Sequence, residues 1–261
     1  MGWPIRLDET WGRAMDLGIA GRTAAVAAGS AGLGLGSAKA LAAEGVRVAI
    51  CGRDPERLAA AAGQIDGEVL TVTADLANPA EGRSFVSQAI EGLGSVDILV
   101  TNAGGPPPGM FDTTEIDAYQ MAFDMNCKAM IEMCRVAIPP MRDRGWGRVC
   151  AITSVGVKQP IPFLLASSVA RAGLTSFLKL TARELAPTGV TVNSAQPGTH
   201  WSDRVAKMMD QEQAAKSNPM NVCGDCDDFG AAVAFLCSEQ AKFITGTGLL
   251  IDGGQSTGLL D

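Results

Sequence analysis

Residues 23–44, TAAVAAGSAGLGLGSAKALAAE, decide the fold of this chain. The segment begins as an apolar strand, passes through a turn rich in glycine, and continues as an alanine-rich helix from residue 33 to residue 44. Glycines let a main chain approach a dinucleotide pyrophosphate, which binds the amide groups at a helix N-terminus. The order strand, glycine turn, helix therefore predicts a dinucleotide site, with an ordinary tight turn as the alternative. The predicted contacts are Ala28, Ser30, Gly32, Leu33 and Gly34.

The rest of the chain alternates short β-branched runs with longer alanine-rich stretches. Strands are predicted at 23–28, 46–50, 69–73, 98–101, 148–153, 190–194 and 248–251, and helices at 33–44, 55–63, 79–92, 115–141 and 165–185. Several strands are apolar throughout, as strands buried on both faces must be. The repetition predicts a single doubly wound α/β Rossmann domain, with seven parallel strands in the order 3-2-1-4-5-6-7 and helices on both faces.

The predicted domain begins after a short polar segment. Residues 1–17 are expected to form an N-terminal arm and residues 18–261 the Rossmann domain, because no repeat or linker marks a second domain. Residues 199–228 form the only long stretch without strand periodicity. We interpret that stretch as a lid over the substrate.

Composition limits the classes of partner. The chain has 261 residues, 47% of them hydrophobic, and a formal charge of −7. An acidic chain offers no basic surface to nucleic acid or an anionic membrane, so a small-molecule substrate is expected instead. Most of the seven cysteines lie in apolar stretches and no run is long enough to span a bilayer. Both features favour a cytoplasmic protein with reduced thiols.

The end of the second predicted strand bears on the choice of cofactor. Folds that bind NAD usually offer a carboxylate there to the ribose hydroxyls, whereas this chain has Gly52 followed by Arg53. A guanidinium suits a 2′-phosphate because it can donate two parallel hydrogen bonds. The sequence thus favours NADP(H), with NAD(H) as the alternative, unless Arg53 is an ordinary solvated arginine.

From about Gly21 to Gly254 the chain resembles the short-chain dehydrogenase/reductase family. The matching pieces are the glycine turn, Asp75-Leu76, Asn102-Ala103-Gly104, Asn126, Ser154, Pro197-Gly198 and Ile251-Asp252-Gly253-Gly254. The resemblance implies an oxidoreductase that interconverts a carbonyl and an alcohol by hydride transfer. It also implies a homotetramer or homodimer, assembled through the two long helices and the C-terminal strand.

The resemblance assigns further cofactor contacts. It implies that Asp75, with Leu76, meets the adenine and that Asn102, Ala103 and Gly104 line the adenosine ribose. Pro197, Gly198 and Thr199 would touch the nicotinamide side. The alternatives are structural, since Asp75 can cap a turn and Asn102 to Gly104 can form one.

The catalytic positions depart from the family pattern. The family has a Tyr four residues before a Lys on the helix after Ser154, and positions i and i+4 share one helix face. Here those positions hold Ser167 and Arg171, while Asn126 and Ser154 match. The resemblance implies that Arg171 binds the nicotinamide ribose, but an arginine does not shuttle protons and a serine hydroxyl is a far weaker acid than tyrosine.

Two other residues are candidate proton donors. Lys158 lies just beyond the end of the fifth strand, and His200, the only histidine, follows Thr199. A solvated loop lysine and a packed lid histidine are the alternatives. If neither acts, the chain binds a dinucleotide without catalysis, as a sensor or as a partner subunit of an active relative.

Two further parts of the sequence bear on the branch of the family and on metal binding. Segments 102–109 and 157–162, together with Arg171, resemble a branch of the family labelled 3-oxoacyl-(acyl carrier protein) reductase-like. Cys223 and Cys226 have the spacing of a redox pair or half a zinc site, but no second pair and no neighbouring histidine accompany them. We therefore expect the two cysteines to pack the lid, and no metal site is predicted.

Overall fold

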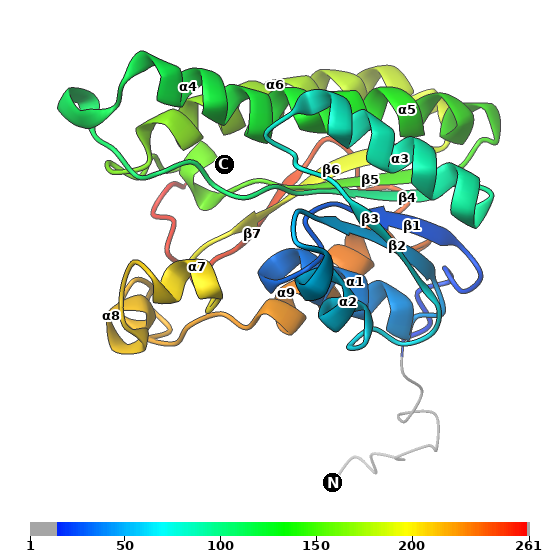
Figure 1. Ribbon diagram of the computed structural model, residues 1–261, viewed down its shortest axis with the longest axis horizontal. Coiled ribbons are helices and arrows are strands. Elements are labelled where there is room, and N and C mark those ends of the chain that lie inside the picture. The colour runs from blue at the N-terminus through cyan, green and yellow to red at the C-terminus, as the bar shows by residue number, and fades with distance from the viewer. Residues whose placement is uncertain (1–14, 260–261) are drawn as a thin grey trace, which may run out of the picture.

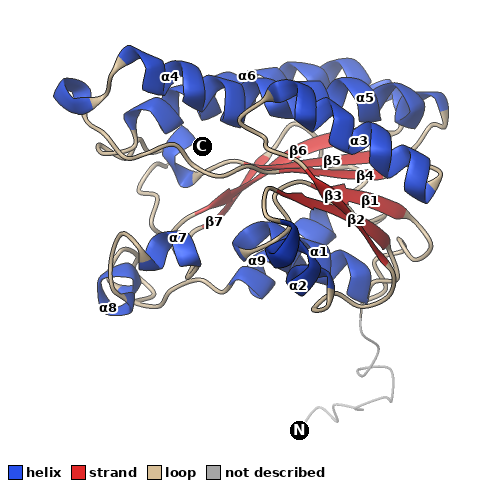
Figure 2. Ribbon diagram, in the orientation of Figure 1, coloured by secondary structure: helices blue, strands red, loops and turns tan. Residues whose placement is uncertain are grey.

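The computed structural model describes residues 15–259, which form a central parallel sheet between two layers of helices (Figures 1 and 2). The strands are β1 (Thr23–Val26), β2 (Arg47–Gly52), β3 (Val69–Thr73), β4 (Ile98–Thr101), β5 (Gly147–Ile152), β6 (Val190–Pro197) and β7 (Gly248–Ile251). They form a 7-stranded sheet in the order β3-β2-β1-β4-β5-β6-β7, and every pairing is parallel. The predicted fold and strand order are confirmed.

Helices cover both faces of the sheet. One face carries α3 (Pro79–Leu93), α4 (Ile116–Phe123), α5 (Ala129–Asp143) and α6 (Leu165–Leu185), and the other carries α1 (Gly32–Ala43), α2 (Pro55–Ala62) and α9 (Cys226–Leu236) (Figure 1). Each face has its own buried apolar cluster, and β1 contributes to both: Ala25 lies in the first, while Ala24 and Val26 lie in the second. Side chains that alternate between two buried faces explain why the strands are apolar throughout.

The helix predicted at 115–141 is interrupted. A π-helical turn, η3 (Asp124–Lys128), separates α4 from α5, and the backbone stays right-handed helical on both sides of it. A π turn inserts one residue into a helix and is frequent at functional sites. This turn contains Asn126, which is fully buried.

Other elements also differ from the prediction: β1 ends at Val26 instead of residue 28, β2 ends at Gly52 instead of residue 50, and β5 is Gly147–Ile152 instead of 148–153. The helix α9 was not predicted, although it packs against α1. Strand β6 continues to Pro197, three residues beyond the predicted end at residue 194. Short 3-10 turns, η2 (Phe111–Thr113), η4 (Val155–Val157) and η5 (Ala186–Thr188), connect the larger elements.

The segment predicted as a lid, 199–228, contains two short helices, α7 (Asp203–Ala206) and α8 (Gln211–Ala215), and the first turn of α9. Of the predicted arm, residues 1–14 lie outside the described residues, and Leu17 is buried against the cluster that includes Ile19. Among residues 15–259, no helix is long and apolar enough to cross a membrane.

Candidate active site

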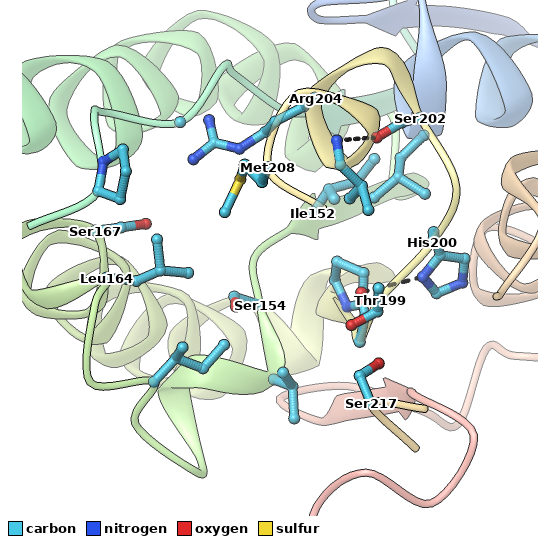
Figure 3. A pocket seen from close by; sticks show the side chains of 18 of the residues that line it. Ile152, Ser154, Leu164, Ser167, Thr199, His200, Ser202, Arg204, Met208 and Ser217 are labelled. Atoms are coloured by element: carbon cyan, nitrogen blue, oxygen red, sulfur yellow. Dashed lines mark hydrogen bonds between the residues drawn. The ribbon is translucent and has the colours of Figure 1, made fainter. Parts of the chain in front are cut away.

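A cavity of about 900 Å³ opens at the carboxyl ends of β4, β5 and β6, under the 199–228 segment. Ligands bind parallel α/β sheets at this edge. Many predicted site residues line the cavity together: Leu33, Asn102, Ala103, Gly104, Ser154, Ser167, Arg171, Pro197, Gly198, Thr199 and His200 (Figure 3). The fold thus brings together, in one cavity, the residues that the sequence assigns to the nicotinamide side and to catalysis.

The glycine turn between β1 and α1 is shaped by its backbone. Ala28 has a φ of +49° and Gly32 a φ of +54°, a region that L side chains seldom adopt. A Cβ on Gly34 would collide with the carbonyl oxygen of Ala28. The residue that precedes α1, Ala31, makes no side-chain cap, and the first turn of the helix has no acidic residue. The first amide groups of α1 are therefore left for an anion, as a pyrophosphate site requires.

The adenosine end of the predicted site lies at the end of β2. Arg53 is exposed and makes no hydrogen bond or ion pair with any described residue. A Cβ on Gly52 would lie 2.8 Å from the Ser30 Oγ, so the space where a carboxylate would stand is occupied. A side chain at position 52 would therefore have to displace the Ser30 hydroxyl.

Asp75 and Leu76 make structural contacts at the end of β3. The Oδ1 of Asp75 accepts a hydrogen bond from the Ala77 amide at 3.1 Å, and the Leu76 side chain is buried in the core. The backbone amide of Asp75 donates to the Glu81 carboxylate at 2.5 Å. The Asp75 carboxylate thus caps a turn, as the structural alternative states, and its contact with an adenine stays a prediction.

Ser167 and Arg171 lie one turn apart on α6, and both are buried. The Nε of Arg171 donates to the Oγ of Ser167 at 3.3 Å, and its Nη1 donates to the carbonyl oxygens of Ile152 at 3.0 Å and Thr153 at 2.9 Å. Burial, and then the charge of Arg204, lower the pKa of Arg171 to about 10. Arg171 therefore remains a cation at neutral pH, and it joins α6 to the end of β5.

Ser154 lines the cavity, whereas Asn126 is fully buried and is not among the residues that line it. Ser154 precedes η4, and its Oγ accepts from the Gly156 amide at 2.9 Å, which leaves its hydroxyl hydrogen to donate elsewhere. The Nδ2 of Asn126 donates to the Gly104 carbonyl at 2.9 Å, while its Oδ1 has no partner among the described residues. Asn126 thus ties the π turn to the loop that follows β4.

The two candidate proton donors lie differently. Lys158 follows η4 and is not among the residues that line the cavity. His200 lies at the cavity wall, but its Nδ1 is 3.2 Å from the Gly198 carbonyl and its ring meets the ring of Phe229 edge to face at 5.2 Å. A Cβ on Gly224 would lie 2.7 Å from the His200 Nε2, so the second ring nitrogen faces backbone. These contacts favour the packing alternative for His200, and both donor roles stay predictions.

Several cavity residues were not predicted from the sequence, and Arg204 is one of them. Arg204 comes from α7, and its Nη2 donates to the carbonyl oxygen of Pro106 at 3.2 Å. Its guanidinium lies so close to Gly105 that any side chain at that position would collide with it. A lone arginine in a polar stretch carries no sequence signal, because only the folding of the 199–228 segment over the sheet edge brings it here.

The cysteine pair lies at the base of the lid segment. The Sγ of Cys226 donates to the Trp201 carbonyl at 3.2 Å, and burial, followed by the charges of Asp225 and Asp227, raises the Cys226 pKa to about 11. Within residues 15–259, no group of three or more His, Cys, Asp or Glu side chains could hold a metal ion. The Cys226 thiol therefore helps to pack the lid against α9.

Comparison with known proteins agrees with this geometry. Residues 27–256 match the family model described as enoyl-(acyl carrier protein) reductase. The chain is 33% identical over 251 residues to dehydrogenase/reductase SDR family member 4 of Sus scrofa, covering 91% of this chain and 88% of that protein. It is 32% identical over 238 residues to the 3-oxoacyl-[acyl-carrier-protein] reductase of Rickettsia bellii, covering 90% and 97%.

A solved structure extends the comparison to three dimensions. The L-sorbose reductase of Gluconobacter frateurii, crystallised with NADPH and L-sorbose, superposes with a TM-score of 0.87 at 27% identity. The superposition covers 94% of this chain and all of that one. Both the order of strands and nearly the full length of the chain are therefore shared with reductases.

Proposed function

Because the chain belongs to the short-chain dehydrogenase/reductase family, we propose that it is an NADP(H)-dependent oxidoreductase that interconverts a carbonyl and an alcohol. One observation carries the proposal. The cavity that holds Ser154, Ser167 and Arg171 is continuous with the loop 102–104 and with Leu33 at the start of α1, where amide groups have no side-chain cap. The hydroxyls of Ser154 and Ser167 thus lie in the same cavity as the proposed binding site for the dinucleotide.

The residues present fit the cofactor. The uncapped start of α1 would hold the pyrophosphate, and Gly34 leaves room beside the Ala28 carbonyl that a side chain would fill. Arg53 would hold the 2′-phosphate, which supports NADP(H) over NAD(H). When bound, the cofactor supplies or accepts the hydride. The solved L-sorbose reductase that resembles this chain was crystallised with NADPH, which also supports the choice.

The chain's own groups then act on the substrate oxygen. Ser154 is free to donate its hydroxyl hydrogen, because its Oγ accepts from the Gly156 amide at 2.9 Å and that bond does not use the hydrogen. Ser167 likewise accepts from Arg171 at 3.3 Å, so its hydrogen is directed away from that guanidinium. Two hydroxyls beside a permanent cation stabilise a developing negative charge on oxygen. Both are weak acids, so proton transfer is slow and turnover should be modest.

A comparison of two variants tests the proposal. NADPH oxidation is followed at 340 nm with a panel of aldehydes and ketones, for the native protein and for Ser154→Ala. We expect slow, saturable turnover that falls about 10²- to 10³-fold in the variant, as loss of one oxyanion donor does. The exposed Ser84 of α3 supplies the control, Ser84→Ala, which should keep native turnover. Unchanged turnover in Ser154→Ala would exclude this site.

A second function is favoured by the residues at the positions of the family Tyr and Lys. Ser167 and Arg171 form a buried, hydrogen-bonded pair, and Arg171 also binds two carbonyl oxygens of β5 and its following residue. Such a pair suits a protein that binds a dinucleotide as a sensor or partner subunit. NADPH binding by titration without oxidation on any carbonyl, together with activity gained by the double variant Ser167→Tyr, Arg171→Lys, would support it.

The proposal includes a homo-oligomer, as a homotetramer or homodimer. Large apolar side chains are exposed on the outer faces of the long helices, namely Ile116 and Met121 on α4 and Val169 and Leu180 on α6. Exposed apolar side chains in proximity support a protein interface there. Sedimentation velocity of the native protein and of Leu180→Glu tests this, and a larger native mass that falls in the variant is the expected outcome.

A further inference from the structure

Arg204 reaches the cavity from the lid segment and has no acidic partner. Among the described residues its only hydrogen-bond partner is the Pro106 carbonyl, and its guanidinium makes no ion pair with any of them. The neighbouring residue, Asp203, points elsewhere, since its carboxylate accepts from Arg57 of α2 at 2.7 Å. The cation at position 204 is thus held in place by a neutral carbonyl while its charge remains unbalanced.

The charge of the whole cavity has one sign. None of the described residues that line it is Asp or Glu, whereas Arg171, Arg204 and Lys207 all line it. This contrasts with the chain as a whole, whose formal charge is −7. A cation-only cavity in an acidic protein selects an anionic occupant, because fixed charges of one sign raise the local concentration of the opposite ion.

The position of Arg204 separates it from the cofactor phosphates. Ser202 lies beside the glycine turn, since a Cβ on Gly32 would be 3.6 Å from the Ser202 Cβ. In Figure 3 the Arg204 guanidinium points away from Ser202, toward the side of the cavity where Ser167 lies. The charge of Arg204 also lowers the pKa of Arg171, which lies next to Ser167. Arg204 is therefore directed at the substrate end.

Arg171 has only its Nη2 left for a ligand, so it does not offer a fork of two free nitrogens to a carboxylate. Its Nε and Nη1 already donate to Ser167, Ile152 and Thr153. Arg204 uses one nitrogen for Pro106 and keeps the others for a ligand, in the planar fork that matches a carboxylate. Apolar side chains surround the remaining space, among them Phe163, Leu164 and Met208.

We propose that the substrate is an oxo acid, whose carboxylate binds Arg204 while its keto group lies at Ser154 and Ser167 and its alkyl chain contacts the apolar wall. The inference rests on the proposed function and names its substrate class. In the reducing direction, hydride from NADPH forms the new C–H bond and the C=O π pair passes to oxygen, which takes a proton. The products are a hydroxy acid and NADP+.

The test compares acids with their neutral esters. Straight-chain 2-, 3- and 4-oxo acids and their methyl esters are assayed with NADPH, for the native protein and for Arg204→Gln. We expect kcat/KM for the preferred acid to fall about 10- to 100-fold in the variant, mainly through KM, and the ester to change less than about threefold. Arg204→Lys should recover part of the loss. Lys216→Gln, a lid cation outside the cavity lining, should behave as native.

Several results would overturn the inference. An equal loss for acid and ester would make Arg204 a support of the lid only, and a matching loss of NADPH affinity would assign it to the cofactor. If no carbonyl compound is reduced, the proposed function fails, and calorimetric titration of the same acids into NADPH-loaded protein decides the inference separately. Acid binding that Arg204→Gln abolishes would sustain it, and absence of acid binding to the native protein would refute it.

Discussion

Gly36 of α1 and Gly230 of α9 are in backbone contact: a Cβ on Gly230 would collide with the carbonyl oxygen of Gly36. The two helices therefore approach more closely than side chains would allow, and α1 carries the glycine turn while α9 closes the lid segment. We expect Gly230→Ala to destabilise the fold by about 1–3 kcal/mol through overpacking. Thermal denaturation should show a Tm lowered by about 2–10 °C for a chain of this size.

Gly63 provides a matched control for that substitution. It has a φ of −67° at the end of α2, and the nearest atom to an added Cβ is 3.7 Å away. Gly63→Ala should therefore leave the Tm unchanged or raise it, since it removes about 0.4–1 kcal/mol of unfolded-state entropy. Equal Tm values for the two variants would show that the close helix contact is relaxed at no cost.

The glycine turn offers a test of backbone shape against affinity. Gly34→Ala places a Cβ against the Ala28 carbonyl, so the turn must shift and NADPH affinity should fall about tenfold or more, equivalent to about 1.4 kcal/mol. Ala28→Gly relieves a φ of +49°, but a glycine also adds entropy to the unfolded chain, so stability should change by less than about 1 kcal/mol. Fluorescence titration with NADPH and urea denaturation measure the two effects, and a native Kd in Gly34→Ala would contradict the assigned cradle.

The fold could be predicted because the local pattern of apolar residues matches the burial of the strands in the sheet. Strands β3, β4 and β7 have the predicted bounds, since each is a short run rich in β-branched or aliphatic residues. Strand β6 was predicted to end at residue 194, but it continues through Gln196 to Pro197, and its polar residues Asn193 and Gln196 are both buried. The Asn193 Nδ2 donates to the Ile244 carbonyl. That hydrogen bond, which satisfies the buried amide of Asn193, joins residues 51 positions apart. The local sequence could not reveal it.

The site was predictable where residues follow strand ends. Asn102, Ser154 and Pro197 end or follow β4, β5 and β6, and parallel strands bring such residues to one edge. The π turn around Asn126 and the position of Arg204 depend on long-range packing instead. The Asn126 amide binds Gly104, and Arg204 lies over Pro106 only because the lid folds back.

Arg53 should determine the preference between NADPH and NADH. It is exposed without a described partner, so Arg53→Gln should not affect stability, but it would remove a charged hydrogen bond to the 2′-phosphate. Such a bond is worth about 1.5–3 kcal/mol, so the Kd for NADPH should rise about 10- to 100-fold. The Kd for NADH should stay constant, and Arg135→Gln on the exposed side of α5 is the control. A parallel loss for both cofactors would place the 2′-phosphate elsewhere.

Arg171 should matter for stability as well as for the site. Its Nη1 is the donor to the carbonyl oxygens of Ile152 and Thr153, at 3.0 and 2.9 Å. Arg171→Met keeps the apolar volume but leaves both oxygens unpaired, at a cost of about 1–3 kcal/mol each before relaxation. Urea denaturation should show Arg171→Met to be less stable than Arg171→Lys, whose ammonium can still donate to one or both oxygens. The reverse order would mean that burial of the charge outweighs these bonds.

His200 should make the protein less stable in mild acid. Burial lowers its pKa below the usual value of 6.5, only partly offset by the Gly198 carbonyl and by Asp225, Asp228 and Asp252. As the pH falls below 6.5, the unfolded chain takes up a proton that the folded chain resists, so stability decreases down to the folded pKa. The free energy of unfolding of the native protein should therefore drop between pH 7.5 and 5.5 by more than that of His200→Gln. His200 is the only histidine, so a difference between the two pH slopes is assigned to it without ambiguity. Parallel slopes would show that the imidazole is as easily protonated in the folded chain as in the unfolded one, which its contacts with Phe229 and Gly198 argue against.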